Sequence, residues 1–146
     1  MAIIYITENV HLPKQFKKRQ ISQWIKEIIR THEKKMGDIT CIFCNNAKIL
    51  EINEQYLKHH YFTDIITFDY TENDTVLGDM FISLETVKTN SELYKTSYEQ
   101  ELRRVIIHGI LHLCGYEDKT RLTKTIMREK EDEALFLFEN VLFNKI

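Results

Sequence analysis

Hydrophobic residues recur along the first part of the chain with two different periods. Residues 2–6 form a short run of β-branched and aromatic side chains, which predicts a β-strand. After Pro13, apolar residues recur at helical spacing through residues 14–35. This pattern predicts an amphipathic helix with a basic outer face that ends near Gly37. Its apolar stripe consists of Phe16, Ile21, Trp24, Ile25, Ile28 and Ile29.

The rest of the chain continues with both kinds of pattern. Strands are predicted at residues 38–45 and in two β-rich runs within 63–87, which a polar turn at 71–74 joins into a hairpin. Three further helices are predicted, over residues 47–58, 97–114 and 123–143. The order β-α-β-α-β-β-α-α predicts an α+β fold in which a small mixed β-sheet of about four strands packs with helices.

The composition is typical of an ordered globular protein. Of the 146 residues, 43% are hydrophobic and 29% are charged, with four glycines and one proline, which argues against disorder. We find no repeat, linker or low-complexity segment. A single domain over residues 1–146 is therefore predicted.

The charge balance gives little general attraction for polyanions. The formal net charge is −2 and the isoelectric point is about 6.3, so no bulk positive field is present. Any nucleic-acid contact would have to come from local clusters, such as Lys17, Lys18 and Arg19, or Arg103 and Arg104. Such clusters are also typical of solvated helix faces.

Cys41 and Cys44 form a C-x-x-C pair in the segment CIFC. This spacing occurs in zinc knuckles and redox pairs, but no second C-x-x-C follows and the segment has the pattern of a strand. Residues three apart on a strand point to opposite faces, so the thiols should diverge. Buried structural cysteines are the prediction.

The first residues, MAIIYITENVHLP, contain an apolar stretch too short to span a bilayer. They also lack the basic region and the small-residue cleavage site of a signal peptide. A cytoplasmic location is expected.

The segment VIIHGILHLCGYED, residues 105–118, carries the most informative chemistry. His108 and His112 are four residues apart, so their Cβ atoms should lie roughly 5–6 Å apart on one helix face. Two hydrogen-bonded core histidines are one explanation. The surrounding run is apolar nearly all round, however, and a buried polar group without a partner costs roughly 1–3 kcal/mol. A shared metal ion would satisfy both imidazoles.

Gly115 and Asp118 complete this pattern. Gly115 can adopt a left-handed conformation that reverses the chain, and Asp118 can then return a carboxylate to the same face. The spacing H-x-x-x-H-x-x-G-x-x-D matches that of the metzincin zinc motif, with Asp118 as the third ligand. Three protein ligands leave one position open, as in catalytic zinc sites, and zinc lowers the pKa of a bound water towards about 7. Hydrolysis is the predicted chemistry.

Two alternatives bear on the metal chemistry. In zincins, the residue after the first histidine is the glutamate that serves as general base, and here it is Gly109. This substitution argues against a peptidase. Two histidines and a carboxylate can also hold non-haem iron, but the helical spacing favours zinc.

The segment HGILHLCGYED resembles the H-G-x-L-H-L-x-G-Y-x-H signature of the YbeY family, the bacterial zinc-dependent endoribonucleases of ribosomal RNA maturation. Three more segments are similar to that family. Residues 52–70, INEQYLKHHYFTDIITFDY, resemble its L-N-x-x-Y-R…T-D-V-L-S-F block. LGDMFISLETV resembles its G-D-I-x-I-S strand, and MREKEDEAL, residues 127–135, its M-x-x-x-E ending. The similarity covers most of the chain after about residue 38.

The resemblance implies that His108, His112 and Asp118 hold one Zn²⁺ per chain and act in catalysis through it. Asp118 stands where the family's third ligand is usually histidine. Leu57 stands where the family usually has an arginine assigned to catalysis or to RNA phosphate contact. A leucine cannot stabilise developing phosphate charge.

Other positions in the resembling segments have less defined roles. The missing cation could come from Lys58, His59 or His60. Thr63 and Asp64 match the family's T-D pair, and Asp64 is a tentative catalytic residue that could order its loop or a metal ligand. Two further residues, Gly78 and Asp79, are expected to open an edge-like strand that lines the cleft. Candidates for a general base are Asp64, Glu101 and Glu117.

The function implied is that of a metal-dependent endoribonuclease in ribosomal RNA maturation, including 3′ end processing of small-subunit rRNA and ribosome quality control. Precursor rRNA and the small ribosomal subunit are the implied partners, with no membrane and no DNA. Single-stranded RNA is the expected target, because its backbone is accessible to a shallow cleft. Leu57 and Asp118 motivate an alternative, a non-catalytic, metal-stabilised ribosome assembly factor. A zinc peptidase-like hydrolase is the third possibility.

Overall fold

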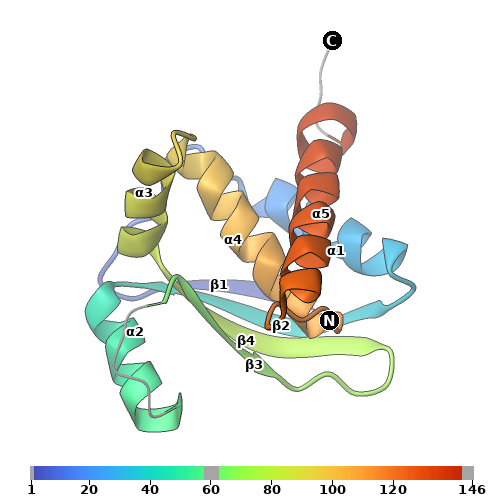
Figure 1. The fold of residues 1–146 in the computed structure, drawn as a ribbon, viewed down its shortest axis with the longest axis horizontal. Helices are drawn as coiled ribbons and strands as arrows, with labels where there is room; N and C mark the ends of the chain where they lie inside the picture. Colours follow the sequence, from blue (N-terminus) through green and yellow to red (C-terminus); the bar gives the residue numbers. More distant parts are fainter. Residues whose placement is uncertain (1, 58–62, 143–146) are drawn as a thin grey trace.

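The computed structural model describes residues 2–57 and 63–142, which form a four-stranded β-sheet packed with helices (Figure 1). The strands are β1 (Ile3–Thr7), β2 (Lys35–Cys44), β3 (Ile65–Asp69) and β4 (Thr75–Ser83). The helices are α1 (Lys18–Thr31), α2 (Asn46–Ile52), α3 (Leu84–Leu93), α4 (Tyr98–Leu113) and α5 (Arg121–Leu137). Two π-helical turns, η1 (Asn53–Leu57) and η2 (Phe138–Leu142), extend α2 and α5.

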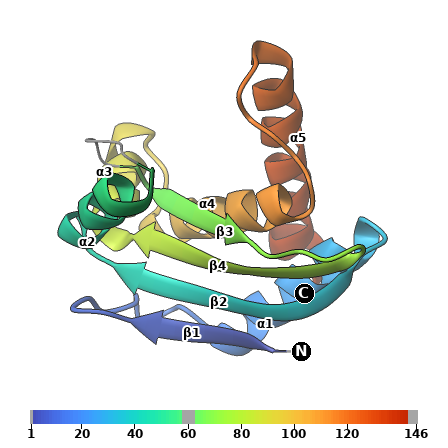
Figure 2. The same cartoon turned by 90° about the horizontal axis from the view of Figure 1, so that it is seen from below.

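The sheet has the strand order β1-β2-β4-β3. β1, β2 and β4 are parallel neighbours, and β3 pairs with β4 in the antiparallel direction. Figure 2 shows the four strands side by side, with α2 near one end of the sheet. The predicted α+β class, the mixed four-stranded sheet and the hairpin are therefore confirmed.

The helices α1, α4 and α5 lie on the same face of the sheet, and the main core fills the space between them and the sheet (Figure 1). The predicted stripe of α1 is buried there at five positions: Ile21, Trp24, Ile25, Ile28 and Ile29. The indole Nε1 of Trp24 donates a hydrogen bond of 2.8 Å to the carbonyl oxygen of Ala134 in α5. This bond ties α5 to α1 and helps to hold α5 beside α4.

Cys41 and Cys44 are both buried and both free of disulfides. Cys41 belongs to the main core, whereas Cys44 belongs to a smaller cluster with Ile49 and Ile52 of α2. The two thiols thus lie on opposite faces of the sheet. Burial raises the pKa of each thiol to about 12, which keeps it protonated. The prediction of buried structural cysteines is confirmed.

Gly37 does not end a helix, contrary to the prediction. α1 stops at Thr31, and the chain turns through Glu33, which has a φ of 60°. Gly37 lies inside β2, where the register with β4 is irregular. A Cβ at position 37 would lie 2.9 Å from the carbonyl oxygen of Val76. The glycine is therefore explained by the close approach of two strands.

Side-chain caps set the observed starts of α2 and α5. The Oδ1 atom of Asn45 accepts a hydrogen bond from the backbone N–H of Lys48 at the start of α2. Thr120 and Thr123 form a reciprocal capping box, so α5 starts at residue 121 rather than 123. The predicted ends of these two helices, at residues 58 and 143, lie outside the described residues.

Helix α3 was not predicted, because its first residues, 84–87, continue the β-rich pattern of the preceding run. The Oγ atom of Ser83 accepts a hydrogen bond from the backbone N–H of Thr86, and Glu85 follows in the first turn. A serine cap with an acidic first turn is a helix-start signal that was available in the sequence. Within the part of the chain that the structure describes, none of the helices is both long and apolar enough to span a membrane.

The strand that carries Gly78 and Asp79 is not an edge strand, contrary to the expectation. β4 lies between β2 and β3, and both residues fall in its middle. Gly78 faces Leu113 at the end of α4. Asp79 lines a shallow hollow on the other sheet face, together with Tyr56 and Phe68. The edge strand next to β4 is β3, because the hairpin folds back on the outside of β4, and β1 forms the opposite edge of the sheet.

The variant Gly78→Ala is expected to lower the free energy of unfolding by about 1–3 kcal/mol. A Cβ at this position would lie 2.7 Å from the carbonyl oxygen of Phe68 and 2.9 Å from Leu113 Cδ2. The oxygen is part of the β3–β4 ladder and cannot move without breaking it. Urea unfolding followed by circular dichroism measures the effect. Asp79→Ala, on the opposite face, is the control, and an equal loss in both variants would contradict the packing argument.

Candidate metal centre

Helix α4 presents both histidines and then reverses the chain. Its first turn is capped by Ser97, whose Oγ accepts a hydrogen bond of 3.1 Å from the backbone N–H of Gln100. At its end, Gly115 has a φ of 107°, and the N–H of Tyr116 donates to the carbonyl oxygen of Leu111. The predicted left-handed turn at Gly115 is confirmed, and it directs the following residues back towards the helix.

Three potential ligand atoms converge at this turn. The Nε2 atoms of His108 and His112 are 3.0 Å apart. Oδ2 of Asp118 lies 3.2 Å from the first of these nitrogens and 3.5 Å from the second. All three side chains are partly exposed. These residues could hold a metal ion that is accessible from solvent.

The opposite ring nitrogens of both histidines have hydrogen-bond acceptors. His112 Nδ1 donates to the carbonyl oxygen of Tyr116 at 2.9 Å, and His108 Nδ1 donates to Oε2 of Glu131 at 2.6 Å. A carbonyl can only accept, so Nδ1 of His112 carries a proton, and the neutral form of this imidazole has its lone pair on Nε2. When both imidazoles are neutral, as metal binding requires, two Nε2 lone pairs and a carboxylate oxygen face one another. This donor set fits a cation, and the bonds at Nδ1 are those that usually orient metal-binding histidines.

Glu131 is the residue that the sequence reasoning missed. It is buried in α5 and accepts from His108 through Oε2, while Oε1 pairs with Arg104 Nη1 at 2.9 Å. The other terminal nitrogen of Arg104 pairs with Asp132 at 3.0 Å. Glu131 is the glutamate of the M-x-x-x-E segment, so a signal was present in the sequence, but nothing there linked it to His108.

The surroundings of His108 favour its charged form when no metal is bound. Burial lowers the pKa of His108, whereas the hydrogen bond to Glu131 and the negative charge of Glu131 raise it. The charges of Asp118 and Asp64 add to this effect, and the pKa lies above its usual range. A metal ion would therefore compete with a proton for Nε2.

A hollow of about 200 Å³ adjoins His108. Asp64 and Glu101 line it together with His108, whereas Glu117 is exposed and does not line it. Burial raises the pKa of Asp64, although the positive charge of His108 opposes the shift. Burial raises the pKa of Glu101 as well, against the charge of Arg104. Of the three predicted general-base candidates, the structure brings Asp64 and Glu101 to the site.

The segment that precedes Asp64 is described only in part. Asn53 is buried in η1, and its Nδ2 donates a hydrogen bond of 3.4 Å to Oγ1 of Thr63. This bond joins the two halves of the segment that resembles the L-N…T-D block. Leu57 is the last residue of η1, and the candidate replacement cations Lys58, His59 and His60 lie outside the described residues.

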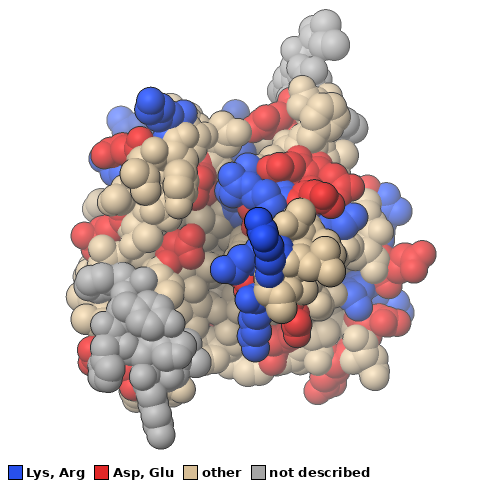
Figure 3. All heavy atoms as spheres, in the orientation of Figure 1, with Lys and Arg blue, Asp and Glu red and all other residues tan. Residues whose placement is uncertain are grey.

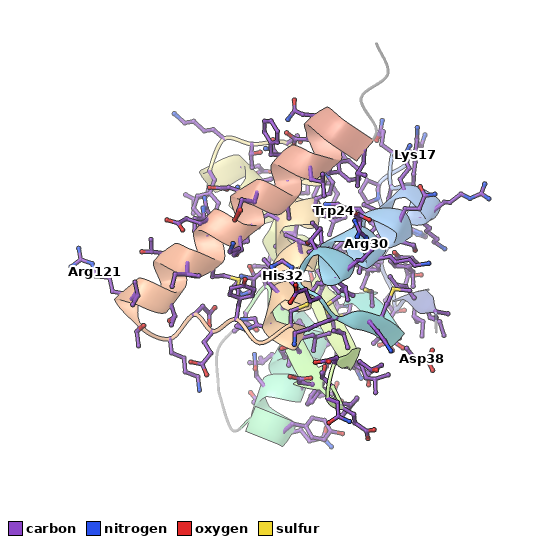
Figure 4. All side chains as sticks on the ribbon, turned by 90° about the vertical axis from the view of Figure 1, so that its right-hand side faces the viewer. Lys17, Trp24, Arg30, His32, Asp38 and Arg121 are labelled. Atoms are coloured by element: carbon purple, nitrogen blue, oxygen red, sulfur yellow. The ribbon has the colours of Figure 1, made fainter. Side chains whose placement is uncertain are left out.

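The two basic clusters differ in their positions and surroundings. Lys17 lies at the far end of α1 from His32, well away from Arg121 at the start of α5 (Figure 4). Arg103 stacks on the ring of Phe138, with its Cζ atom 4.6 Å from the ring centre. Arg104 is occupied by its two acidic partners. Arg103 and Arg104 thus stabilise the fold and do not form the solvated face that their spacing suggested.

Comparison with known proteins identifies the family. A model described as Endoribonuclease YbeY matches residues 6–139 of the 146. The chain belongs to the YbeY family. The resemblance of the four sequence segments is thereby confirmed.

Curated members of the YbeY family match nearly the whole chain. A protein from Bacteroides fragilis is 57% identical over 135 residues, which are 92% of this chain and 96% of that protein. Another, from Parabacteroides distasonis, is 56% identical over 92% of this chain and 94% of its own. A third, from Porphyromonas gingivalis, is 44% identical over 99% of this chain and 95% of its own. Each of the three is named Endoribonuclease YbeY.

A solved structure also has this fold. The solution structure of TM1509 from Thermotoga maritima matches with a TM-score of 0.67 and 26% sequence identity. The match covers 94% of this chain and 89% of the other. The fold of this YbeY-family chain is thus shared with a protein of much lower sequence similarity.

Proposed function

We propose that this chain is a cytoplasmic, zinc-dependent endoribonuclease that acts in 3′ end maturation of small-subunit ribosomal RNA and in ribosome quality control. Membership of the YbeY family supports the reaction class. The observation that carries the proposal is the convergence of His108 Nε2, His112 Nε2 and Asp118 Oδ2 on one point. Precursor rRNA and the small ribosomal subunit are the proposed partners.

Zinc is the metal that suits these donors best. Two imidazoles and one carboxylate are ligands of catalytic zinc sites, which leave a further position open. When bound, zinc supplies Lewis acidity that polarises a phosphodiester or a water molecule. His108, His112 and Asp118 would hold it. Non-haem iron uses the same ligand types, and elemental analysis separates the two.

The neighbouring side chains would orient the ligands and handle protons. Glu131 fixes the ring of His108, and the carbonyl of Tyr116 fixes the ring of His112. We propose that Asp64 accepts a proton during cleavage, because it lines the hollow next to His108. Its raised pKa brings this carboxyl nearer to neutral pH, where a general base works best.

Gly109, the residue after the first histidine, does not support a peptidase-like role. A Cβ at Gly109 would lie 2.5 Å from Met80 Sδ and 2.6 Å from Ile65 Cδ1, so position 109 faces the sheet. A glutamate there could not reach the ligands without displacing the core. The non-catalytic assembly factor is still a distinct alternative, because Leu57 carries no cation for a phosphate.

Purified protein is expected to bind about one zinc ion per chain and to cleave a small-subunit rRNA precursor near its 3′ end. Chelation should stop cleavage, and added zinc should restore it. Elemental analysis and gel electrophoresis of the end-labelled precursor measure the two results. A normally folded protein that binds no metal would contradict the zinc site. Zinc-loaded protein that binds the small subunit without cutting RNA would favour the assembly factor.

A further inference from the structure

The hollow beside His108 has a cationic side chain at its mouth. The hollow lies between α3, α4 and α5. Its volume of about 200 Å³ equals that of roughly seven water molecules in the liquid. Its lining includes Arg104 and Arg128 on one side and the neutral donors Asn90 and Tyr94 on another. The space suits one polar group with its hydration.

The two arginines of the hollow differ in what they already bind. Arg104 is only 18% exposed and has short ion pairs with both Glu131 and Asp132. The side chain of Arg128 is 62% exposed. Its ion pair with Glu131 is long, at 3.9 Å, and is too long for a hydrogen bond. Arg128 can therefore turn its N–H groups towards a ligand without breaking a strong contact.

Arg128 lies on the side of α5 that faces the metal centre. It precedes Glu131 by three residues, which places both on one helix face. Lys124 precedes Glu131 by seven residues, or nearly two full turns, and shares that side. Arg121, at the start of the helix, is exposed as well. Figure 3 shows Lys and Arg side chains running down the middle of this face of the molecule, where α4 and α5 lie.

The acidic groups of the hollow lie deeper or are already paired. Glu101 is buried, and both carboxylate oxygens of Glu131 are occupied by Arg104 and His108. Asp64 is partly buried beside His108. The carboxylates deep in the hollow would therefore repel an anion, whereas the exposed guanidinium of Arg128 at its opening would attract one.

We infer that Arg128 binds a phosphate of single-stranded RNA at the mouth of this hollow, next to the metal centre. A guanidinium donates two parallel hydrogen bonds to a phosphate, which gives both attraction and orientation. Lys124 and Arg121 continue the path of the RNA backbone along α5. The inference rests on the proposed endoribonuclease function, because it names where the substrate of that reaction would lie.

Arg128→Gln tests this inference, with Arg128→Lys as the variant that restores the charge. The probe is a short single-stranded RNA of rRNA 3′ end sequence, tested for binding with zinc-loaded protein over a range of salt concentrations. Arg128→Gln is expected to weaken binding about tenfold. The slope of log affinity against log salt is expected to fall by about 0.7, the value for one phosphate contact on a single strand. Arg128→Lys should recover most of the slope.

Arg30→Gln is the matched control, since Arg30 is an exposed helical arginine three residues from its partner Glu27. This variant should bind RNA like the wild type. Zinc content and melting temperature should stay unchanged in all three variants, which separates phosphate binding from a structural role. An Arg128→Gln protein with wild-type affinity and salt slope would overturn the inference.

Cleavage of the same RNA distinguishes failure of the inference from failure of the proposed function. If the wild type cleaves and Arg128→Gln is unaffected in both binding and cleavage, the inference is wrong and the function stands. If the wild type binds but does not cleave, the proposed function is wrong, and the salt slope still decides the role of Arg128. A wild type that does neither overturns both.

Discussion

Alanine at His108, His112 or Asp118 is expected to remove the bound metal and to reduce RNA cleavage by about a thousandfold or more. The three ligand atoms lie within 4.8 Å of one another, so each variant would leave only two protein ligands. Two ligands are fewer than catalytic zinc sites use. A thousandfold loss corresponds to roughly 4 kcal/mol of transition-state stabilisation, which is within the several kcal/mol that metal catalysis supplies.

Metal content after dialysis and single-turnover cleavage of the rRNA precursor measure this effect together. His11→Ala is the matched control, because His11 is exposed in the segment before α1 and does not belong to the ligand group. It should keep both zinc and activity. Persistent cleavage by both His108→Ala and His112→Ala would defeat the metal mechanism, whatever the control does.

Glu131→Gln is expected to weaken metal binding roughly 10–100-fold, although Glu131 touches no metal. A glutamine has one acceptor oxygen, whereas Glu131 accepts from both His108 Nδ1 and Arg104 Nη1. One of these donors would then face the NH₂ group of the glutamine. Breaking the buried ion pair should also lower the free energy of unfolding by about 3 kcal/mol, because Arg104 would keep a poorly compensated charge.

Asp132→Asn is the control for Glu131→Gln. Asp132 is the second acidic partner of Arg104, but its side chain is 59% exposed. Losing an exposed pair should cost no more than about 1 kcal/mol. Metal titration and urea unfolding would be measured on both variants. If Asp132→Asn weakened metal binding as much as Glu131→Gln, the effect would come from Arg104 and not from the bond to His108.

Local sequence patterns were enough to predict much of the fold and the convergence of His108, His112 and Asp118. The i, i+4 spacing of His108 and His112, the glycine at 115 and the return of Asp118 all act within the eleven residues 108–118. Helical geometry and one left-handed residue relate these positions, so the chain elsewhere has little influence on them. The same holds for the buried stripe of α1 and for the divergence of Cys41 and Cys44 on β2.

The errors occurred where a residue's role depends on a distant segment. Gly37 looked like a helix end, but it is explained by the backbone of Val76 in a neighbouring strand. The strand with Gly78 looked like an edge, but β2 and β3 cover both of its sides. Local periodicity depends only on residues that are close in the chain, so it contains no information about such long-range contacts.

The sequence by itself determined a helix with two histidines, the turn after it and the carboxylate that could complete a metal site, because their spacing is set by local backbone geometry. Tertiary structure alone decided what surrounds that group. Glu131 lies 23 positions from His108 and reaches it only because Trp24 and the core hold α5 against α4. Asp64 and Arg128 meet at one hollow for the same reason. The orientation of the candidate ligands and the shape of the hollow beside them therefore depend on packing between segments that share no local pattern.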